Sequence, residues 1–549
     1  MNVAEVVGET LARCGVDHVF GVVGSGNFEV TNAMAKHGAT FVAARHEGGA
    51  ATMADAYARM SGTVAAVSVH QGCGLTNALT GITEAAKSRT PLVVVAAEAI
   101  QPLSNFYVDQ PALAKAVGAV SLRLDGAEEA QQKTTAAVAR AINQRRVVLL
   151  NLPLDVQVLE VTALALPDRT AADRPSRAAS PAPDPAQIER LVSALTTASR
   201  PVFVAGRGSR GAGCQAALER LGDRCGALLA TSAVTKGLFA GNPWSLDVSG
   251  GFASPLAAEL IAAADLVVAW GCALSMWTTR HGSLISSEAA VVQVDVERQA
   301  LGAHRDITFG VVGDVQRTAE AASSAWPGGS ATGCRTQRVR TALSERVRWR
   351  DTSYEDTSDG DRIDPRTLTI ALDDMLPAER VVSVDSGNFM GYPSMYLDVP
   401  DEYGFCFTQA FQSIGLGLAT AIGAALARPD RLPVAALGDG GALMGASELE
   451  TVARLGLPMV VVVYNDHAYG AEVHHFGPSG KPLDTVTFPD TDLAAVARGY
   501  GFDSLTVRRP EDLSRVASWL VGDRSRPLLI DAKVVADQPS WWLAEAFGH

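Results

Sequence analysis

Residues 432–470 read LPVAALGDGGALMGASELETVARLGLPMVVVVYNDHAYG, a stretch in which two apolar runs are each followed by a polar loop. The runs Val434–Leu437 and Met459–Tyr464 are typical of short strands buried on both faces of a parallel sheet. GDGG follows the first run directly, and NDHAYG follows the second. Because parallel strands end at the same edge of their sheet, we expect the two loops to be neighbours.

The two loops contain the residue types that bind a metal and a diphosphate. Asp439 and Asp466 offer hard oxygen ligands, and the glycines allow backbone N–H groups to approach phosphate oxygens. Mg²⁺ takes about six oxygens, usually from one or two carboxylates, phosphates and water. GDGG alone is typical of a tight turn, but its pairing with an Asn-Asp loop predicts a diphosphate–metal site.

The rest of the chain repeats the same α/β pattern, and its 549 residues are too many for one core. We expect three doubly wound α/β domains at 1–165, 186–345 and 362–549, with a Pro- and Ala-rich linker at Leu166–Pro185. Helices are expected at Gly48–Met60, Leu75–Ala86, Gln412–Ala427 and Ser447–Leu455. The other expected strands are His18–Val23, Phe41–Ala44, Val64–Val69, Leu92–Ala97, Pro201–Ala205, Leu266–Trp270, Val291–Val294, Val381–Val384 and Leu528–Ile530.

Composition and charge exclude several classes of protein. A net charge of −13 argues against a nucleic-acid partner or an anionic membrane surface. No apolar run reaches the length of a membrane span, and residues 1–5 show no basic patch followed by an apolar stretch, so we expect no signal peptide. The seven scattered cysteines lack CxxC spacing, which favours reduced thiols. We therefore expect a cytoplasmic enzyme.

Gly-Asp-Gly followed some 25 residues later by Asn-Asp resembles the signature of thiamine-diphosphate-dependent enzymes. The resemblance to their decarboxylase and carboligase superfamily, which includes acetohydroxyacid synthase, benzoylformate decarboxylase and benzaldehyde lyase, covers nearly the whole chain. It implies an N-terminal aminopyrimidine-binding domain, a central domain and a C-terminal diphosphate-binding domain. It also implies that Asp439, Asp466 and the backbone carbonyl of Ala468 hold Mg²⁺. The cofactor-binding residues that it implies in the C-terminal domain are Asp385, Gly387, Asn388, Gly438, Gly440, Gly441, Tyr469 and Gly470.

The stretch Arg45–Arg59, with Arg-His-Glu-x-x-Ala at its start, also resembles this family. By itself Glu47 is typical of an acid in the first turn of a helix. The resemblance implies that Glu47 bonds the ring nitrogen N1′ of the aminopyrimidine and so activates the cofactor, which acts as the electron sink. It places Ile414 under the cofactor as an apolar wedge. Because relatives share each site between two subunits, it implies a homodimer or homotetramer.

The substrate pocket is less clear from the sequence. Ser25 and His70 match the positions of the active-site Ser and His of benzoylformate decarboxylase, and an imidazole suits proton transfer near neutral pH. Glu472 falls where pyruvate decarboxylases place a catalytic Glu, and Ala471 matches a small wall residue of benzaldehyde lyase. A lone His after a strand or an acid on a helix is equally typical of structural roles. The remaining pocket candidates are Asn27, Gln71, Asn105, Gln110, His474 and His475.

The expected reaction is carbon–carbon bond formation or cleavage on a 2-oxo acid. Decarboxylation gives an enamine, which an acetolactate-synthase-like carboligase passes to an aldehyde or keto acid acceptor. The alternative is a decarboxylase that releases an aldehyde, with His70 and Glu472 protonating the enamine. A non-enzymatic homologue is disfavoured because Glu47 and Asp439 are both present.

The central domain leaves one further alternative open. Residues 206–211 read GRGSRG after the strand Pro201–Ala205 and satisfy the GxGxxG pattern of dinucleotide binding. The acidic residue that a dehydrogenase needs about 20 residues later, at the end of a second strand, is missing. In related synthases this domain binds FAD, so FAD in the central domain stays open. The apolar tail Ser540–Phe547 is expected to be a short docking helix or lid.

Overall fold

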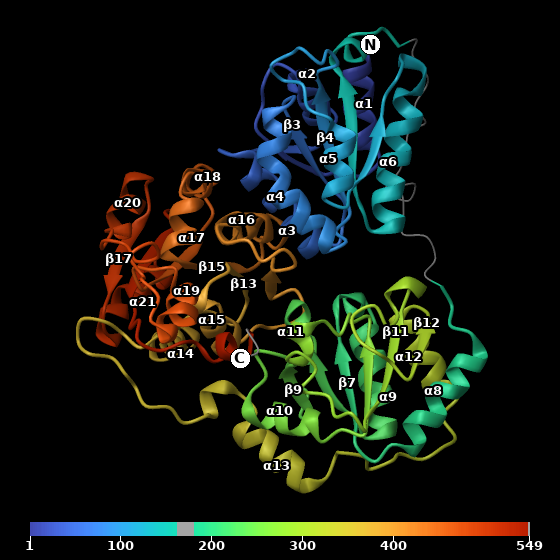
Figure 1. The fold of residues 1–549 in the computed structure, drawn as a ribbon, viewed down its shortest axis with the longest axis vertical. Coiled ribbons are helices and arrows are strands. Elements are labelled where there is room, and N and C mark those ends of the chain that lie inside the picture. The colour runs from blue at the N-terminus through green and yellow to red at the C-terminus, as the bar shows by residue number, and fades with distance from the viewer. Residues whose placement is uncertain (162–180, 547–549) are drawn as a thin grey trace.

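The computed structural model describes residues 1–161 and 181–546, which form three α/β domains, each built on a six-stranded sheet (Figure 1). All the strand pairings within the three sheets are parallel. The fold class expected from the sequence is therefore confirmed. The expected linker at Leu166–Pro185 and the end of the expected tail at Phe547 lie largely outside the described residues.

The first domain, coloured blue to cyan in Figure 1, has the strand order β2-β1-β3-β4-β6-β5. Its strands are β1 (His18–Gly21), β2 (Thr40–Ala43), β3 (Ala65–Val69), β4 (Leu92–Glu98), β5 (Val120–Arg123) and β6 (Val147–Pro153). Its helices are α1 (Val3–Arg13), α2 (Phe28–Lys36), α3 (Glu47–Ser61), α4 (Cys73–Lys87), α5 (Gln110–Ala116), α6 (Ala130–Gln144) and α7 (Leu154–Gln157).

The third domain, coloured gold to red, has the equivalent order β14-β13-β15-β16-β18-β17. Its strands are β13 (Arg380–Val384), β14 (Phe405–Phe407), β15 (Leu432–Gly438), β16 (Val460–Asn465), β17 (Asp503–Val507) and β18 (Leu528–Lys533). Its helices are α14 (Pro365–Met375), α15 (Gly391–Tyr396), α16 (Gly417–Ala427), α17 (Asp439–Met444), α18 (Glu448–Arg454), α19 (Gly470–Phe476), α20 (Leu493–Gly499), α21 (Ser514–Val521) and α22 (Trp541–Ala546).

The middle domain, coloured green, has a different order, β12-β11-β10-β7-β8-β9. From β7 the strands are added first on one side of the sheet and then, from β10, on the other, and the boundary between β7 and β10 is the switch point where doubly wound sheets bind ligands. Its strands are β7 (Pro201–Ala205), β8 (Leu228–Thr231), β9 (Ser245–Val248), β10 (Leu266–Trp270), β11 (Ala290–Asp295) and β12 (Phe309–Val312). Its helices are α8 (Pro185–Thr197), α9 (Cys214–Cys225), α10 (Pro255–Ala262), α11 (Met276–Thr279), α12 (Val315–Ser324) and α13 (Gln337–Arg346).

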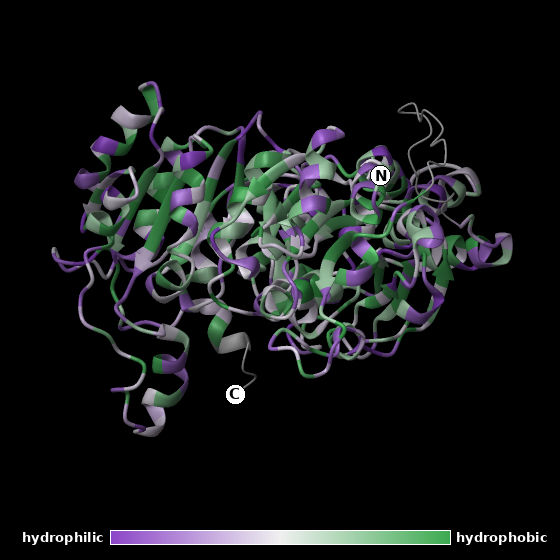
Figure 2. Cartoon of the chain, turned by 90° about the horizontal axis from the view of Figure 1, so that it is seen from above, coloured by the Kyte–Doolittle hydropathy of each residue, from purple (hydrophilic) through white to green (hydrophobic). Residues whose placement is uncertain are grey.

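Apolar strands are buried on both faces because helices cover both sides of each sheet. In β4, Val94 belongs to one buried apolar cluster, whereas Val93 belongs to the cluster on the opposite face. Figure 2 shows the strands mainly in green, whereas purple gathers on the surrounding helices and loops. The cluster around Val94 continues into the third domain, where it includes Val461 of β16. The first and third domains therefore share one core.

Helices α3 and α16 pack against each other in this shared core. A Cβ on Gly423 would lie 2.2 Å from the backbone oxygen of Met53, so only glycine allows the two helices to approach this closely. None of the helices within residues 1–161 and 181–546 has both the length and the apolar character needed to cross a membrane.

The expected helix Gln412–Ala427 is wrong in its first turn, because α16 begins only at Gly417. Gln412 and Gly415 have left-handed φ angles of 60° and 86°, which a right-handed helix does not allow. Residues 412–416 instead form a loop over the carboxyl end of β13. The apolar pattern of α16 extends into this loop because Ile414 and Leu416 also lie against the protein interior, which explains why the sequence predicts a longer helix.

Candidate active site

Three aspartates follow three neighbouring strands of the third sheet. Asp385 follows β13, Asp439 begins α17 directly after β15, and Asp466 follows β16. These strands are adjacent and parallel, so all three carboxylates lie at one edge of the sheet. The structure thus brings together the two loops that the sequence predicts to be neighbours.

The carboxylates of Asp439 and Asp466 lie in an environment that disfavours negative charge. Burial raises the pKa of Asp439 to about 6. Burial and the charge of Asp439 raise the pKa of Asp466 to about 7. Asp466 Oδ1 accepts a hydrogen bond from the Ala468 amide at 3.2 Å. A buried and a partly buried carboxylate that repel each other suit a divalent cation, which would offset both charges.

Asp385 ties this edge together through backbone amides. It is 1 % exposed, and it accepts hydrogen bonds from the amides of Ser386 at 2.8 Å and Gly415 at 3.0 Å. Burial raises the pKa of Asp385 to about 6. The contact with Gly415 fixes the loop that carries Ile414, whose half-buried side chain lines a cavity beside this edge.

Glycines let these loops approach one another closely. A Cβ on Gly441 would lie 2.2 Å from Asp385 Oδ2, and one on Gly470 would lie 2.4 Å from Asp466 Oδ2. A Cβ on Gly440 would lie 2.5 Å from the ring of Tyr469. At Gly387, φ is 144°, a left-handed conformation that also favours glycine.

The C-terminal tail binds the loop after β13. The Ser540 amide donates to the side-chain oxygen of Asn388 at 3.0 Å, and the Ser540 hydroxyl donates to the Asn388 carbonyl at 2.7 Å. Trp542 Nε1 donates to the same carbonyl at 2.9 Å. The expected docking helix is therefore present as α22, whose Trp542 side chain packs against Trp277 of the middle domain with ring centroids 5.8 Å apart.

Helix α19 carries the four pocket candidates that follow the Asn-Asp loop. Ala471 and Glu472 line the same cavity as Ile414, Ser386 and Gly387, and Glu472 is exposed. His474 lies partly buried, and its Nε2 has no hydrogen-bond partner among the described residues. Burial lowers the pKa of His474. The His475 ring packs edge-on against Phe476 with centroids 4.6 Å apart.

Glu47 lies at the carboxyl edge of the first sheet, as the first residue of α3 after β2. It is half-buried, and its Oε2 accepts a hydrogen bond from the Asn77 side chain at 3.0 Å. His46 precedes it as the N-cap and accepts the Gly48 amide at 3.0 Å. The helix therefore starts at a defined residue and presents Glu47 at its first turn.

His70 follows β3 at the same edge and lies close to Glu47, whose charge acts on the imidazole. Its Nδ1 accepts the Gly26 amide at 3.2 Å. In the neutral ring the hydrogen is then on Nε2, so Nε2–H is the available donor. Burial, which outweighs the charge of Glu47, lowers the pKa of His70, and the ring is neutral near pH 7.

The loop after β1 positions this histidine. Asn27 is fully buried and bonds the Ser68 hydroxyl, the Val22 carbonyl and the Gly24 amide. Ser25 lies exposed between these anchored residues. The Gln71 side chain is 5 % exposed, and its Oε1 has no hydrogen-bond partner among the described residues.

Asn105 and Gln110 flank a loop that covers His70. Asn105 is exposed, whereas Gln110 is 1 % exposed and donates to the Ala97 carbonyl at 2.7 Å. The Phe106 ring packs edge-on against His70 with centroids 5.4 Å apart. Phe106 thus contacts the imidazole, whereas the Gln110 amide is engaged by the Ala97 carbonyl.

The candidate residues therefore form two groups, one at the edge of the first sheet and one at the edge of the third. A cavity of about 1500 Å³ lies between the three domains. Within the part of the chain that the structure describes, its lining includes Ile414, Ala471 and Glu472 of the third-sheet group. It includes no member of the first-sheet group, which comprises Ser25, Asn27, Glu47, His70 and Gln71.

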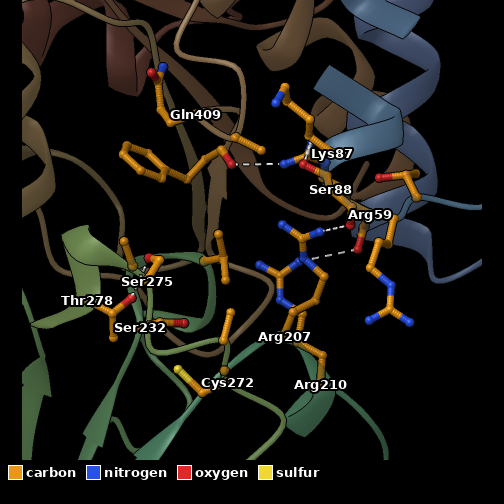
Figure 3. A pocket seen from close by; sticks show the side chains of 18 of the residues that line it. Arg59, Lys87, Ser88, Arg207, Arg210, Ser232, Cys272, Ser275, Thr278 and Gln409 are labelled. Carbon is orange, nitrogen blue, oxygen red and sulfur yellow. Dashed lines mark hydrogen bonds between the residues drawn. The ribbon is translucent and has the colours of Figure 1, made fainter. Parts of the chain in front are cut away.

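The opposite end of this cavity lies at the switch point of the middle sheet. Figure 3 shows Arg207 and Arg210 of the middle domain beside Arg59 and Lys87 of the first, with Gln409 of the third across the space. Arg207 donates to the Ser88 carbonyl, but its Nε has no partner among the described residues. Burial and the charges of Arg59 and Arg210 lower the pKa of Arg207 to about 9.

This end of the cavity suits an anionic ligand. Its basic lining residues outnumber its acids, although the chain as a whole has a net charge of −13. Both amide atoms of Gln409 are buried without a partner among the described residues, so they are available to a ligand. The GRGSRG pattern at residues 206–211 indicated a loop whose backbone a ligand could approach. It did not indicate Gln409, which belongs to another domain.

Sequence reasoning also missed residues that support the first-sheet group. Asn77 and Phe106 contact Glu47 and His70, and the carboxylate of Glu448 bonds the backbone just before Glu47. Asn77 lies in α4, the next helix along the chain after the one that Glu47 begins. Its place near the start of that helix was the one feature of the sequence that could have indicated the contact with Glu47. Glu448 lies about 400 residues away, and no pattern in one sequence indicates that contact.

Three family models match successive parts of the chain. They describe the N-terminal, central and C-terminal domains of thiamine pyrophosphate enzymes and match residues 1–117, 188–322 and 385–532. Sulfoacetaldehyde acetyltransferase of Alcaligenes xylosoxydans xylosoxydans is 28% identical over 93% of this chain and 89% of its own. The acetolactate synthase large subunit of Parasynechococcus marenigrum is 26% identical over 92% of this chain and 83% of its own.

The fold is also similar to that of a solved structure. The thiamine diphosphate-dependent 4-hydroxybenzoylformate decarboxylase of Rhodococcus jostii RHA1 superposes with a TM-score of 0.81 at 23% identity. The match covers 98% of this chain and 100% of that one. At this identity the likeness concerns the arrangement of all three domains and not the reaction.

Proposed function

Because this chain belongs to the thiamine-diphosphate-dependent enzymes, we propose that it is a carboligase that acts on a 2-oxo acid. It would remove the carboxyl group and join the remaining fragment to an acceptor aldehyde or keto acid. The observation that carries the proposal is the pair of sheet edges, one with Glu47 beside His70 and one with Asp439 beside Asp466. When bound, thiamine diphosphate supplies the nucleophilic carbon and the electron sink that this chemistry needs.

In this proposal the third-sheet edge retains the cofactor. Asp439, Asp466 and the Ala468 carbonyl hold Mg²⁺, and the amides of the glycine-rich loop approach the diphosphate. The raised pKa values of these mutually repelling carboxylates support this assignment, because a divalent cation offsets the unfavourable negative charge. The Asp466 carboxylate adds negative charge beside the anionic diphosphate, so it is not expected to tighten cofactor binding. Ile414 supplies the apolar support below the cofactor rings.

The first-sheet edge handles protons. Glu47 holds a proton at the ring nitrogen N1′, with its second oxygen fixed by Asn77. His70 presents Nε2–H toward the substrate side, because the Gly26 amide occupies Nδ1. Ser25 and Glu472 are the further candidates for proton transfer at the substrate.

The separation of the two edges supports a homodimer, or a homotetramer built from such dimers, with each site shared between subunits. Exposed apolar side chains flank both edges, including Leu103 at 99% and Phe106 at 43% on the first, and Leu443 at 46% and Met444 at 53% on the third. A two-fold dimer would cover these patches and bring Glu47 of one chain to the Asp439 edge of its partner.

Mixed dimers test this arrangement. Glu47→Gln and Asp439→Ala chains, each inactive alone, would be unfolded together, refolded and assayed. Random mixing is expected to restore about a quarter of the wild-type activity, because about half of the dimers are mixed and each mixed dimer holds one intact site. Refolded wild-type protein is the control. No recovery in the mixture, with full recovery of the control, would contradict a shared site.

A decarboxylase that releases an aldehyde is the second candidate, and the proton-handling group of His70 and Ser25 favours it. The wide cavity beside Ala471 favours ligation, because an acceptor needs room next to the cofactor. Product analysis separates them: the protein with thiamine diphosphate and Mg²⁺ receives pyruvate or benzoylformate, with and without an aldehyde. A 2-hydroxy ketone or acetohydroxy acid indicates ligation, whereas aldehyde and CO₂ alone indicate decarboxylation.

We also propose that FAD occupies the basic end of the cavity, as the second cofactor that the sequence left open. The switch point, the glycines at 206 and 208 and the guanidinium of Arg207 fit a diphosphate-bearing ligand. The visible absorbance of the purified protein and a titration with FAD test this, and Arg207→Met should weaken binding about tenfold.

The seven free thiols support a reducing, cytoplasmic compartment.

A further inference from the structure

The carboxylate of Glu448 bonds the backbone that leads into Glu47. Glu448 is the first residue of α18 in the third domain and is 3 % exposed. Its Oε1 accepts the amides of Arg45 and His46, both at 3.0 Å. Its Oε2 accepts the Thr451 hydroxyl at 2.6 Å, which fixes the orientation of the carboxylate. Charge-assisted bonds of this kind are stronger than neutral ones.

The two bonded amides belong to the extended segment between β2 and α3. His46 has φ −147° and ψ 142°, so the chain enters the helix from a strand-like conformation. The amides of Arg45 and His46 therefore have no partner within α3, and Glu448 satisfies both. The direction in which the Glu47 side chain points from the first turn of α3 depends on the position of this segment.

Gly49 makes the approach of Glu448 to this segment possible. A Cβ at this position would lie 2.5 Å from Glu448 Oε1 and 3.0 Å from its Cδ. A glycine is therefore needed at the second glycine position of the His-Glu-Gly-Gly stretch, because the Glu448 carboxylate occupies the space that a side chain would take.

We propose that Glu448 is a positioning residue that sets the place of the Glu47 carboxylate through the backbone of residues 45 and 46. The inference rests on the proposed role of Glu47, and it concerns a residue that touches neither metal nor substrate. Because activation by Glu47 requires a hydrogen bond of defined length, a small shift of the helix start is expected to slow it strongly. Retention of the cofactor depends on the third-sheet edge and is expected to be unaffected.

The experiment uses exchange of the cofactor C2 hydrogen for deuterium, which reports activation without any substrate. The holoenzyme with thiamine diphosphate and Mg²⁺ is transferred to D₂O, quenched in acid and read by NMR. We expect Glu448→Ala to slow this exchange about 30-fold to 100-fold, as for a displaced catalytic group. Its affinity for thiamine diphosphate with Mg²⁺, measured by quenching of tryptophan fluorescence, should stay within about twofold of wild type.

Three further variants separate positioning from a general structural effect. Glu448→Gln keeps an oxygen for both amides and should restore exchange to within about threefold of wild type. Gly49→Ala displaces the carboxylate from the other side and should slow exchange as Glu448→Ala does. Glu450→Ala is the matched control, because Glu450 lies on the same helix and its carboxylate, within the described part of the chain, bonds the side chains of Arg45 and Arg454 and no backbone amide. It should match wild type.

The outcomes distinguish this inference from the proposed function. If wild type binds the cofactor but does not exchange C2 faster than free cofactor, the proposed function fails. If wild type exchanges rapidly and Glu448→Ala does so equally, the positioning role fails. It fails as well if Glu448→Ala loses cofactor affinity in parallel, or if Glu450→Ala slows exchange to the same extent. Should Glu448→Ala not fold, Glu448→Gln and Gly49→Ala decide between these results.

Discussion

The first and third sheets have the same strand order, yet their carboxyl edges differ in charge and burial. At the first edge the candidate carboxylate, Glu47, is half-buried and bonded by the Asn77 amide, with a neutral imidazole nearby. At the third edge Asp385 and Asp439 are buried and Asp466 is partly buried, and the pKa of each is raised to about 6 or 7. One topology thus presents two environments, because the loops and not the strands supply the functional groups.

The difference suggests a division of labour. Buried carboxylates are costly in the absence of a cation, so the third edge suits retention of a metal and a diphosphate. A carboxylate and an imidazole that remain accessible suit transfer of protons. Variants at the first edge should therefore change turnover without changing cofactor affinity, and variants at the third edge should change affinity first.

The largest expected effect is that of Glu47→Gln. An amide cannot take the role of the carboxylate at the ring nitrogen, so turnover should fall by as much as about 10⁴-fold. The affinity for thiamine diphosphate with Mg²⁺, from fluorescence quenching, should change little because the third edge is intact. Full activity in this variant would contradict the role of Glu47 and with it the comparison of the two edges.

Asp439→Ala should have the complementary effect. Removal of one partner of a buried charged site costs about 4 kcal/mol, which corresponds to an affinity about a thousandfold lower. A thermal melt with and without thiamine diphosphate and Mg²⁺ measures this, since bound cofactor raises the melting temperature of wild type. A variant that keeps the Mg²⁺-dependent stabilisation would show that Asp439 is not a ligand.

Much of this comparison could be predicted from the sequence. Asp439, Asp466 and Glu47 each follow an apolar strand within one or a few residues, so local pattern and chemistry were sufficient to find them. The three-domain α/β fold followed from the same alternation of strands and helices. The start of α16 was wrong because Gln412 and Gly415 have left-handed φ angles and the Gly415 amide bonds Asp385, and neither feature is visible in the apolar spacing.

Contacts between distant parts of the chain were beyond a single sequence. Glu448 bonds residues about 400 positions earlier, and the Gln110 amide is held by the Ala97 carbonyl inside the first domain. The basic cavity combines arginines of one domain with Gln409 of another. Each depends on how domains pack together, and the local preferences of the residues involved give no sign of it.

His70→Asn tests the role of the imidazole at the first-sheet edge through the pH dependence of turnover. Turnover is expected to fall about 100-fold, with cofactor affinity unchanged. Burial lowers the pKa of His70 below its ordinary 6.5, so the neutral ring persists to lower pH than in an exposed histidine. Activity that uses the neutral ring is present above this pKa and is lost as the pH falls through it. The wild-type pH–rate profile should show this acidic limb below pH 6.5, and the variant should lack it.

The smallest expected effect concerns the C-terminal tail, whose residues Ser540 and Trp542 bond Asn388 at the third-sheet edge. Trp542→Ala removes one hydrogen bond to the Asn388 carbonyl, worth about 1 kcal/mol, so cofactor affinity should weaken about fivefold. Trp541→Ala is the control, because Trp541 is 42% exposed and packs against Trp349 and Arg280 without bonding this loop. If the two variants weaken binding equally, the tail stabilises the protein in general. If only Trp542→Ala weakens cofactor binding, and C2 exchange in the cofactor-saturated enzyme is unchanged, the tail stabilises the third-sheet edge and not the first.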